Sequence, residues 1–385
     1  MDLDFTPAQR RFRSEARDWL RSRVPTAKLA SYDTREGFEQ HRAWEATLAE
    51  GGWSSVIWPK ELGGKGCDLI EWLIFEEEYH AADAPMRVNQ NGILLLGPTL
   101  MEFGTPEQKA RFLPRMARCD DMWAQGWSEP NAGSDMAAIS SRAIRDGDEY
   151  VLNGQKTWST RALYANWLFG LFRSDPQSSR HHGLSYLLVP LDAKGITIRP
   201  IKALNGKQAF AEVFFDDVRV SVANRIGDEG QGFRCILQGM NPERILIAAE
   251  AVGLGQAALA RATRYAGERE VFGRPIGQNQ AIQHPLAECW MQLEAAMLMV
   301  WKAASRYDRG LPCGAEANAA KYLAAEAGHQ ACLQAVMTHG GYGYAKAYHV
   351  ERYLRESLIP RLAPISPQLV LCHIAEKVLG LPKSY

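Results

Sequence analysis

The sequence predicts an α+β protein made of three successive blocks: a helical block, a β block and a second helical block. Residues 1–120 carry apolar side chains at helical spacing, together with repeated helix-start signals. Residues 121–226 contain short runs rich in β-branched and aromatic residues, which Gly, Asn and Asp separate. Residues 227–385 return to Ala- and Leu-rich segments with helical periodicity. We therefore expect domains at 1–120, 121–226 and 227–385.

The helical signals of the first block begin at its N-terminus. Thr6 and Pro7 are typical of an N-cap and a first helical residue, and an amphipathic helix follows them. Thr105, followed by Pro106 and Gln108, is a capping signature for a later helix. The first residues lack the apolar core of a secretory signal peptide, so we expect none here.

The β block and the last block have equally local signals. The Asn153-Gly154 pair predicts a hairpin turn inside the β block. The last block contains four helical segments, at 243–268, 280–308, 314–340 and 366–379. Asn241 with Pro242, and Ser366 with Pro367, predict the starts of the first and the fourth of these helices.

Composition excludes several broad classes of function. The 44 basic and 44 acidic residues give a formal net charge of zero, which gives no support to binding of nucleic acid or a membrane surface. The seven cysteines are scattered without CxxC spacing, which favours a reducing compartment over a disulfide framework. Metal-ligand spacing is absent, and no stretch approaches a transmembrane length. We expect a cytoplasmic protein without a metal.

One motif invites a different interpretation. Residues 253–258 match a loose dinucleotide fingerprint, which would indicate a nicotinamide cofactor. That fingerprint requires a preceding strand and an alternating βαβ unit, whereas here one helical pattern follows another. We therefore interpret these small residues as a close helix contact.

Five motifs occur in one order along the chain: "WAQGWSEPNAGSDMAAIS" at 123–140, "YVLNGQKTWST" at 150–160, "GDEGQGF" at 227–233, "ERILIAAEAVGLGQAALARATRYAGEREVFGRPIGQNQAIQ" at 243–283, and "THGGYGY" at 338–344. Together they closely resemble the acyl-CoA dehydrogenase family of flavoproteins, over essentially the whole chain. The resemblance implies a helical N-terminal domain, a middle β-barrel-like domain and a C-terminal four-helix bundle.

The same resemblance implies a reaction and its partners. It implies FAD as cofactor, an acyl-CoA thioester as substrate and electron-transferring flavoprotein as electron acceptor. It also implies a homodimer or homotetramer in which FAD touches two subunits. Oxidation at Cα–Cβ needs a base for the α-proton, flavin N5 as hydride acceptor, and donors that stabilise negative charge on the thioester oxygen.

The resemblance assigns roles to residues by matching position. Trp127 and Ser128 would contact the flavin ring, with Gln125 on the same edge, and Trp158 and Thr160 would lie near the ring and its N5. Ser134 would lie near the CoA moiety, and Arg244 would belong to the substrate site. The remaining residues matched to FAD contacts are Arg269, Phe272, Gln280, Gly340, Gly341, Ser366 and Gln368, of which Arg269, Phe272 and Gln280 would reach the neighbouring subunit's FAD.

The catalytic base has one candidate supported by a motif. Many family members carry a glutamate near the C-terminus, but Pro364 occupies that position here. Others, resembling isovaleryl-CoA and long-chain acyl-CoA dehydrogenases, carry the base just before an arginine on the first long C-terminal helix. Glu243 followed by Arg244 matches that arrangement. Composition alone would make Glu243 a helix-dipole residue, so the resemblance carries this assignment.

Two departures from the family pattern leave alternatives open. Proline has no backbone N–H, so Pro364 cannot donate to the thioester oxygen as the family position does; Ile365 or a flavin hydroxyl would have to replace it. Met337 stands where a glutamine is common. A flavin oxidase-type relative, or a half-active subunit of a heteromeric complex, are therefore alternatives, and the acyl group is not specified by the sequence.

Overall fold

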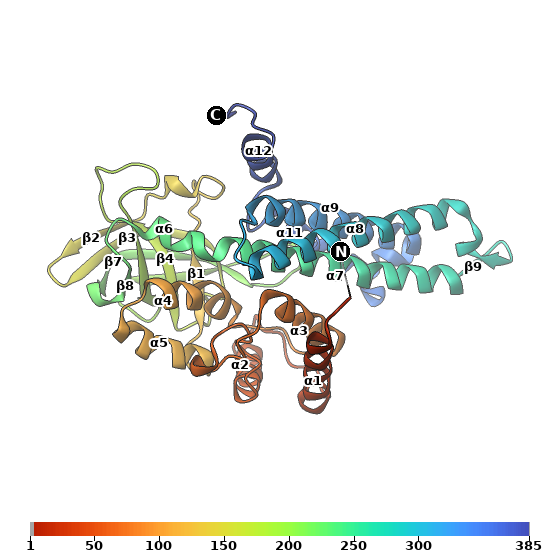
Figure 1. Ribbon diagram of the computed structural model, residues 1–385, viewed down its shortest axis with the longest axis horizontal. Coiled ribbons are helices and arrows are strands. Elements are labelled where there is room, and N and C mark those ends of the chain that lie inside the picture. Colours follow the sequence, from red (N-terminus) through yellow and green to blue (C-terminus); the bar gives the residue numbers. More distant parts are fainter. Residues whose placement is uncertain (1–3, 385) are drawn as a thin grey trace. The chain divides into compact units, whose positions relative to one another are not determined.

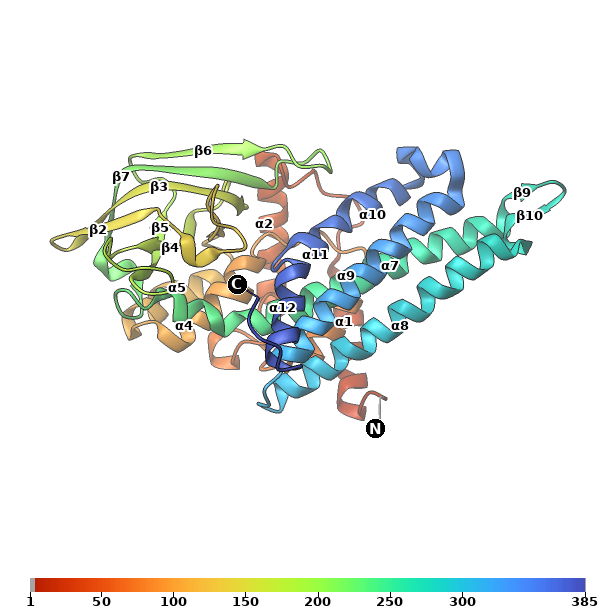
Figure 2. The same cartoon turned by 90° about the horizontal axis from the view of Figure 1, so that it is seen from above.

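Figures 1 and 2 show the computed structural model of the chain, which describes residues 4–384. Its contacts divide the chain into two compact units, the first ending at Met240 and the second beginning at Asn241. The helical and β blocks that we predicted as separate domains thus form a single unit. The predicted boundaries at 120/121 and 226/227 remain predictions.

The first unit begins with helices, whose starts follow the capping signals. Thr6 and Thr105 both form capping boxes, with Gln9 and Gln108 as the reciprocal partners, and Asp68 forms a third with Glu71. The two predicted helix starts are confirmed. The helical elements are α1 (Pro7–Arg23), α2 (Arg35–Glu50), η1 (Lys60–Leu62), α3 (Leu69–Ala81), η2 (Asn91–Leu96), α4 (Gly97–Phe103) and α5 (Pro106–Ala117).

A single eight-stranded sheet follows, with strand order β6-β7-β3-β2-β4-β5-β8 and β1 paired to β4. Within residues 4–384 the sheet stays open, since β6 and β8 stand at the ends of this order, so "barrel-like" overstates its closure. The strands are β1 (Trp123–Gly126), β2 (Arg142–Asp146), β3 (Glu149–Thr160), β4 (Trp167–Arg173), β5 (Leu184–Pro190), β6 (Ile196–Ile201), β7 (Phe210–Ser221) and β8 (Arg225–Ile226), with short turns η3 (Met136–Ala138) and η4 (Val222–Asn224).

The hairpin predicted at Asn153-Gly154 is wrong. Both residues lie inside β3, and the hairpin between β2 and β3 turns at Gly147, which has a φ of 62°. Gly154 instead marks an irregularity in the pairing of β3 with β7. A Cβ there would lie 2.3 Å from the Ser141 hydroxyl oxygen, so close approach explains this glycine.

The helices and the sheet of the first unit share one core, which explains why they form one unit. Trp58, Leu96 and Phe112 from the helical block pack with Trp123 and Tyr186 from the sheet, all essentially inaccessible to solvent. Burial of large aromatic side chains is a major favourable term in folding. The residues on the two sides of position 120 therefore share one core.

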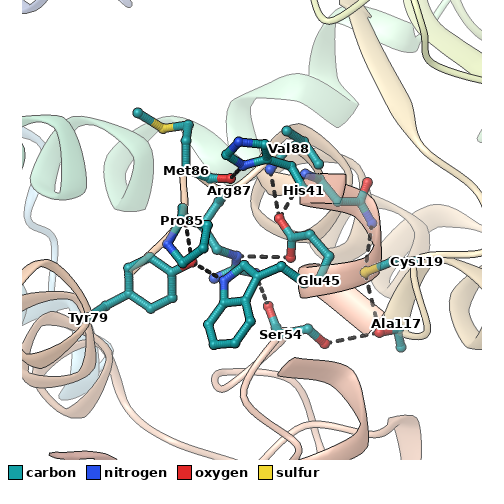
Figure 3. Close-up of polar contacts among 12 residues, drawn as sticks. His41, Glu45, Ser54, Tyr79, Pro85, Met86, Arg87, Val88, Ala117 and Cys119 are labelled. Atoms are coloured by element: carbon teal, nitrogen blue, oxygen red, sulfur yellow. Dashed lines mark hydrogen bonds and ion pairs between the residues drawn. The ribbon is translucent and has the colours of Figure 1, made fainter. Parts of the chain in front are cut away.

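A buried ion pair organises the segment between α3 and η2 (Figure 3). The Glu45 carboxylate, fully buried on α2, accepts from Arg87 Nε at 2.9 Å and from the backbone N–H groups of Val88 and Asn89 at 2.7 and 3.1 Å. Arg87 also donates to the Ser54 carbonyl at 2.6 Å. One carboxylate thus ties three stretches of chain together.

The second unit consists of three long helices and several short elements. After α6 (Gly232–Ile236) and η5 (Leu237–Gly239), which belong to the first unit, come α7 (Met240–Glu268), β9 (Glu270–Val271), β10 (Arg274–Pro275), η6 (Ile276–Gln278), α8 (Gln280–Asp308), α9 (Gly314–His339), η7 (Gly340–Tyr344), η8 (Lys346–Tyr348), α10 (Val350–Glu356), α11 (Leu358–Leu362) and α12 (Pro367–Lys377). Figure 2 shows the β9–β10 hairpin and α12 at opposite ends of the long helices.

Small residues hold α7 and α9 in close contact. A Cβ on Gly328 would lie 2.3 Å from the Ala251 carbonyl oxygen, and one on Gly255 would lie 2.9 Å from the Gly328 Cα. Further along, the rings of Tyr265 and His339 stack at 4.2 Å. Residue numbers rise together on both helices, so the helices run parallel. Residues 253–258 lie within α7, which supports our interpretation of them as a helix contact.

The predicted start of α7 is displaced. The helix begins at Met240, so Asn241 and Pro242 lie within its first turn, and the Asn241 side chain accepts from Arg244 instead of capping the helix. Pro242 is tolerated because N–H groups of the first turn need no partner within the helix. The Ser366 prediction is confirmed: its side chain accepts from the Leu369 N–H at the start of α12.

Two helical stretches, 232–268 and 350–377, are long and apolar enough to cross a bilayer by length and composition alone. Our expectation that no stretch reaches that length was too strict. Half of the apolar window in the first stretch is buried inside the protein, and residues 363–366 interrupt helix in the second. This is weak evidence for a membrane span. All seven cysteines are free thiols.

Replacing Glu45 tests the buried ion pair. Glu45→Ala leaves the buried Arg87 guanidinium without a counter-charge, and we expect it to lower the free energy of unfolding by about 3–5 kcal/mol, as measured by urea denaturation. Glu39→Ala is the matched control, because Glu39 pairs with Arg42 on the same helix but is half exposed; it should cost about 1 kcal/mol or less. Equal losses in the two variants would contradict the assignment.

Candidate active site

Two motif segments from the sequence lie side by side in the first unit. The backbone N–H of Thr157 donates to the Ser128 carbonyl at 2.9 Å, and Lys156 Nζ donates to the Trp127 carbonyl at 3.4 Å. The segment 125–128, at the end of β1, is therefore fixed against 158–160, at the end of β3. The predicted residues Gln125, Trp127, Ser128, Trp158 and Thr160 form one candidate site.

A buried ion pair beneath these segments was missed by our sequence analysis. Lys156 Nζ lies 2.8 Å from Glu129 Oε1, and both side chains are at least 95% buried. Glu129 also accepts from the N–H groups of Ser140 and Ser141 at 2.7 and 3.0 Å. A signal existed: Lys156 shares the inward-facing alternation of Tyr150 and Leu152 on β3, where a polar residue requires a partner.

The pKa directions agree with a charged pair. Burial by itself raises the pKa of Glu129, but the Lys156 ammonium and the donating N–H groups outweigh it, so the pKa lies below its ordinary value. Burial lowers the pKa of Lys156 to about 8, against the opposing effect of Glu129. The pair is thus stable as carboxylate and ammonium at neutral pH.

The backbone at the end of β3 has an unusual conformation. Trp158 and Arg161 have φ values of 56° and 68°, in the left-handed region that non-glycine residues seldom adopt. The ladder with β7 shifts register between Lys156 and Ser159. As a result the Trp158 ring, on a central strand, is 57% exposed instead of buried. Such local strain is typical of sites that hold a ligand.

The other predicted residues of this unit lie nearby in sequence but differ in setting. The Trp127 ring stacks on Tyr186 at 5.2 Å and is partly buried against the core of the first unit. Ser134 is exposed, in the turn where the neighbouring Asp135 pairs with Arg180 at 3.2 Å. Ser134 makes no contact that selects a ligand, and its assignment rests on the resemblance.

A cavity of about 470 Å³ lies at the β9–β10 end of the second unit. It is lined by three of the predicted residues, Arg269, Gly340 and Gly341, and also by Tyr265, Val271, Ile276, Thr338, His339 and Tyr342. The sequence analysis missed Tyr265 and His339, although His339 directly precedes the quoted glycine pair. Phe272 is fully exposed at the hairpin tip, and Gln280 is exposed as the first residue of α8.

Glu243 stands at the other end of α7. Arg269 lies 26 positions further along, just beyond the end of the helix, which corresponds to about 39 Å. Ser366 and Gln368 are also far from the cavity, at the start of α12 (Figure 2). The structure therefore divides the predicted residues of the second unit between two distant sites.

The surroundings of Glu243 favour a neutral carboxyl. Burial raises its pKa to about 7, and the Arg244 charge opposes this only in part. Within residues 4–384 the Glu243 side chain has no hydrogen bond or ion pair, and Arg244 donates to Asn241 Oδ1 at 3.1 Å. The Glu243 carboxyl therefore titrates near neutral pH, and its oxygens are not engaged by a neighbouring side chain. Both properties suit a general base.

The comparison with known sequences decides the family. Models of the acyl-CoA dehydrogenase N-terminal, middle and C-terminal domains match residues 6–120, 124–218 and 230–364. The chain belongs to the acyl-CoA dehydrogenase family. It is an oxidoreductase that acts on acyl-CoA and carries FAD, and its fold is the three-domain fold of that family.

Individual relatives agree with this assignment. Acyl-CoA dehydrogenase IpdE1 of Mycobacterium tuberculosis is 45% identical over 60% of this chain, a match that spans 62% of that relative. Acyl-CoA dehydrogenase FadE12 of the same species is 37% identical over 97% of this chain and 98% of its own length. The crystal structure of the ChsE4–ChsE5 complex from that species matches with a TM-score of 0.87 and 31% identity, and the match covers all of both chains.

The residues present fit a flavin dinucleotide. The cavity at the hairpin end combines a cation, Arg269, with the stacked rings of Tyr265 and His339, which suit a phosphate and a flat base. A Cβ on Gly340 or Gly341 would meet no protein atom within 4 Å, so these glycines leave room for a ligand. In the first unit, the exposed Trp158 ring and the half-buried Thr160 lie at the end of β3, where they could meet a flat ring.

Replacing Lys156 tests the ion pair beneath the first site. Lys156→Met leaves Glu129 charged and buried, so we expect a loss of about 3–5 kcal/mol in the free energy of unfolding and a reduced FAD content on purification. Replacing both partners, by Glu129→Gln with Lys156→Met, should recover most of the stability. The exposed Lys194→Met is the control. A single variant as stable as this control would contradict the role of the pair.

Proposed function

We propose that this protein oxidises an acyl-CoA thioester to the 2-enoyl-CoA, with Glu243 as the base that takes the α-proton. The observation that carries the proposal is the state of Glu243: an unpaired carboxylate whose pKa lies near 7 because of burial. A base works best when its pKa is near the operating pH, and an ordinary glutamate at about 4.3 would be weaker. Pro364 cannot serve, since its side chain accepts no proton.

The chain's own residues supply positioning and electrostatics. When bound, FAD supplies the acceptor for the hydride that leaves Cβ. Trp127, Ser128, Trp158 and Thr160 would hold its ring, and Gln125 would lie on the same edge. Arg269, Phe272, Gln280, Gly340 and Gly341 would hold its dinucleotide portion. Ser134 and Arg244 would contact the CoA moiety and the substrate site, while Ser366 and Gln368 would approach the cofactor from α12.

The distance along α7 supports a site shared between two chains. Glu243 and Arg269 are about 39 Å apart, which is longer than an extended FAD molecule. If both act at flavin sites, they act at different ones, and each site takes the base from one chain and the dinucleotide contacts from another. We therefore propose a homodimer or a homotetramer of dimers. With a two-fold axis, each chain would give its base to one flavin site and its dinucleotide contacts to the other, so the two sites would be identical.

A second candidate is a subunit of a heteromeric acyl-CoA dehydrogenase. Pro364 and Met337 are the observations that favour it, and the structural neighbour ChsE4–ChsE5 is a complex of two different chains. Purification of the chain alone separates the two candidates. One FAD per chain, reduced on addition of acyl-CoA, supports the homomer.

We propose electron-transferring flavoprotein as the acceptor, on the family resemblance alone. We also propose a cytoplasmic location, which the seven free thiols support. The acyl group is best identified by bleaching of the flavin absorbance with a panel of acyl-CoAs of different length and branching.

Glu243→Gln tests the base directly. The amide cannot accept the α-proton, so we expect kcat to fall by at least about 100-fold, within the usual range for loss of a general base. For the wild type, kcat/KM should rise with pH through about 7 and level off above it, because only ionised Glu243 accepts a proton.

The control for this variant is Glu250→Gln, an exposed position on the same helix. Stability gives an independent check. The raised pKa means that the folded state binds more protons than the unfolded state between about pH 4.5 and 7. The contribution of Glu243 to the free energy of unfolding therefore falls as pH rises through that window. Glu243→Gln should therefore be at least as stable as wild type at pH 8. Wild-type turnover in the variant would overturn the proposal.

Mixing two impaired variants, at an FAD concentration that loads the wild type but not Arg269→Ala, tests the shared site. Arg269→Ala should weaken FAD binding by about 10- to 100-fold, because a charge-assisted bond to phosphate is lost. Random reassembly with Glu243→Gln should restore about a quarter of the wild-type activity, since half of the dimers then contain one intact site. Arg264→Ala, also exposed at the end of α7, is the control. No recovery after verified subunit exchange would exclude a site built this way.

A further inference from the structure

The turn that precedes α12 is held by a buried lysine. Lys321, on α9, is only 1% exposed, and its Nζ donates to the backbone carbonyl of Ile365 at 2.6 Å. Among residues 4–384 this ammonium forms no ion pair; the nearby Glu326 pairs with Arg361 at 2.9 Å. Burying an ammonium with a single neutral acceptor is costly, so the side chain calls for an explanation beyond packing.

The electrostatic setting makes the cost plain. Burial lowers the pKa of Lys321 to about 8, and the Arg244 charge lowers it further against the opposing effect of Glu326. An apolar side chain of the same length would fill this space without that penalty. What Lys321 adds is a fixed direction for the Ile365 carbonyl.

That direction determines where a backbone donor points. The peptide between Ile365 and Ser366 is trans, so the Ser366 N–H points opposite to the Ile365 carbonyl, away from Lys321. Neither Ile365 nor Ser366 donates its N–H to any acceptor in the part of the chain that the structure describes. In a capping box, the side chain of the third helical residue would accept from the Ser366 N–H. Here that residue is Leu369, whose side chain has no acceptor.

The turn and Glu243 lie at the same end of the second unit. Contacts between the parallel helices α7 and α9 join Ala251 to Gly328, and Leu254 to Cys332. The two residues of each pair are separated by nearly the same number of positions in the sequence. Applying the same separation nearer the N-termini of the helices places Arg244 level with Lys321. The mutual effect of the Arg244 and Lys321 charges agrees with this register.

We infer that Lys321 is a positioning residue that orients the Ser366 backbone N–H to donate to the thioester oxygen of the acyl-CoA. This inference rests on the proposed dehydrogenation and replaces the donor that Pro364 lacks. As Glu243 removes the α-proton, negative charge develops on that oxygen, and a preorganised N–H stabilises it. Lys321 itself touches neither substrate nor cofactor.

Lys321→Met removes the hydrogen bond and keeps the length and burial of the side chain. We expect kcat to fall by about 10- to 100-fold, part of the effect of losing an oxyanion donor, with KM within about threefold of wild type. Because a buried charge is also removed, the Tm should not fall. Lys321→Arg, which keeps a donor, should retain more activity. Lys302→Met, on the exposed face of α8, should match wild type.

The donor itself is tested at position 366. Ser366→Ala removes the helix cap and keeps the N–H, whereas Ser366→Pro removes both at a φ of −68° that proline adopts. We expect the proline variant to be slower than the alanine variant by at least about tenfold.

An infrared measurement on the loaded protein reports the same bond without turnover. The probe is the 2-enoyl-CoA product of the best substrate, labelled with ¹³C at the thioester carbonyl. A donor lowers the stretching frequency of that carbonyl, so the band should move toward its position in free solution in Lys321→Met and Ser366→Pro. It should move less in Ser366→Ala and stay unchanged in Lys302→Met.

The outcomes separate this inference from the proposed function. Turnover retained in Glu243→Gln would overturn the proposed function. An inactive Glu243→Gln together with near-wild-type kcat and an unmoved carbonyl band in Lys321→Met would overturn the Lys321 inference alone. A drop in Tm with no change in the band would assign Lys321 a purely structural role and would also overturn it.

Discussion

The candidate site at the ends of β1 and β3 depends on one interaction, the ion pair between Lys156 and Glu129. Lys156 is buried on an inward-facing position of β3 and reaches Glu129 in the chain that follows β1, so the pair joins these two segments. Because a lone charge at either position would be strongly destabilising, the two motif segments can only persist together. The strained φ values of Trp158 and Arg161 are tolerated on this fixed base.

Helix length imposes a second constraint, on the unit that follows. One uninterrupted helix carries Glu243 near its start and leads to Arg269 just beyond its end, and no rearrangement of side chains brings these residues together. If both serve a flavin, assembly is part of the catalytic design and not an addition to it. The wide separation of Ser366 from the hairpin cavity has the same meaning.

Much of the fold could be predicted because its signals are local. Caps at Thr6, Thr105 and Ser366 depend only on residues of their own helix. The change from helical to β-strand sequence patterns can be recognised within a short window of residues. Long-range effects could not be predicted in this way. The turn at Gly154 was mispredicted because its close contact is with Ser141, thirteen residues earlier. The cap at Asn241 was mispredicted because a preceding helical turn continues into α7. The site motifs came from resemblance. The alternation along β3 indicates that Lys156 needs a buried partner, but its pairing with Glu129 and the contact of Lys321 with Ile365 depend on distant segments.

The glycine contact between α7 and α9 has a consequence for how this enzyme can change. Gly328 and Gly255 leave no space for a methyl group between the two backbones, so a larger residue at either position would push the helices apart. The glycine contact, about two to three helical turns from Glu243 and from Lys321, thus sets the relative position of these two residues along the helix axes. If Glu243 is the base and Lys321 positions the donor, substitutions elsewhere in the second unit can change the substrate while this glycine contact keeps the two residues at the same relative height.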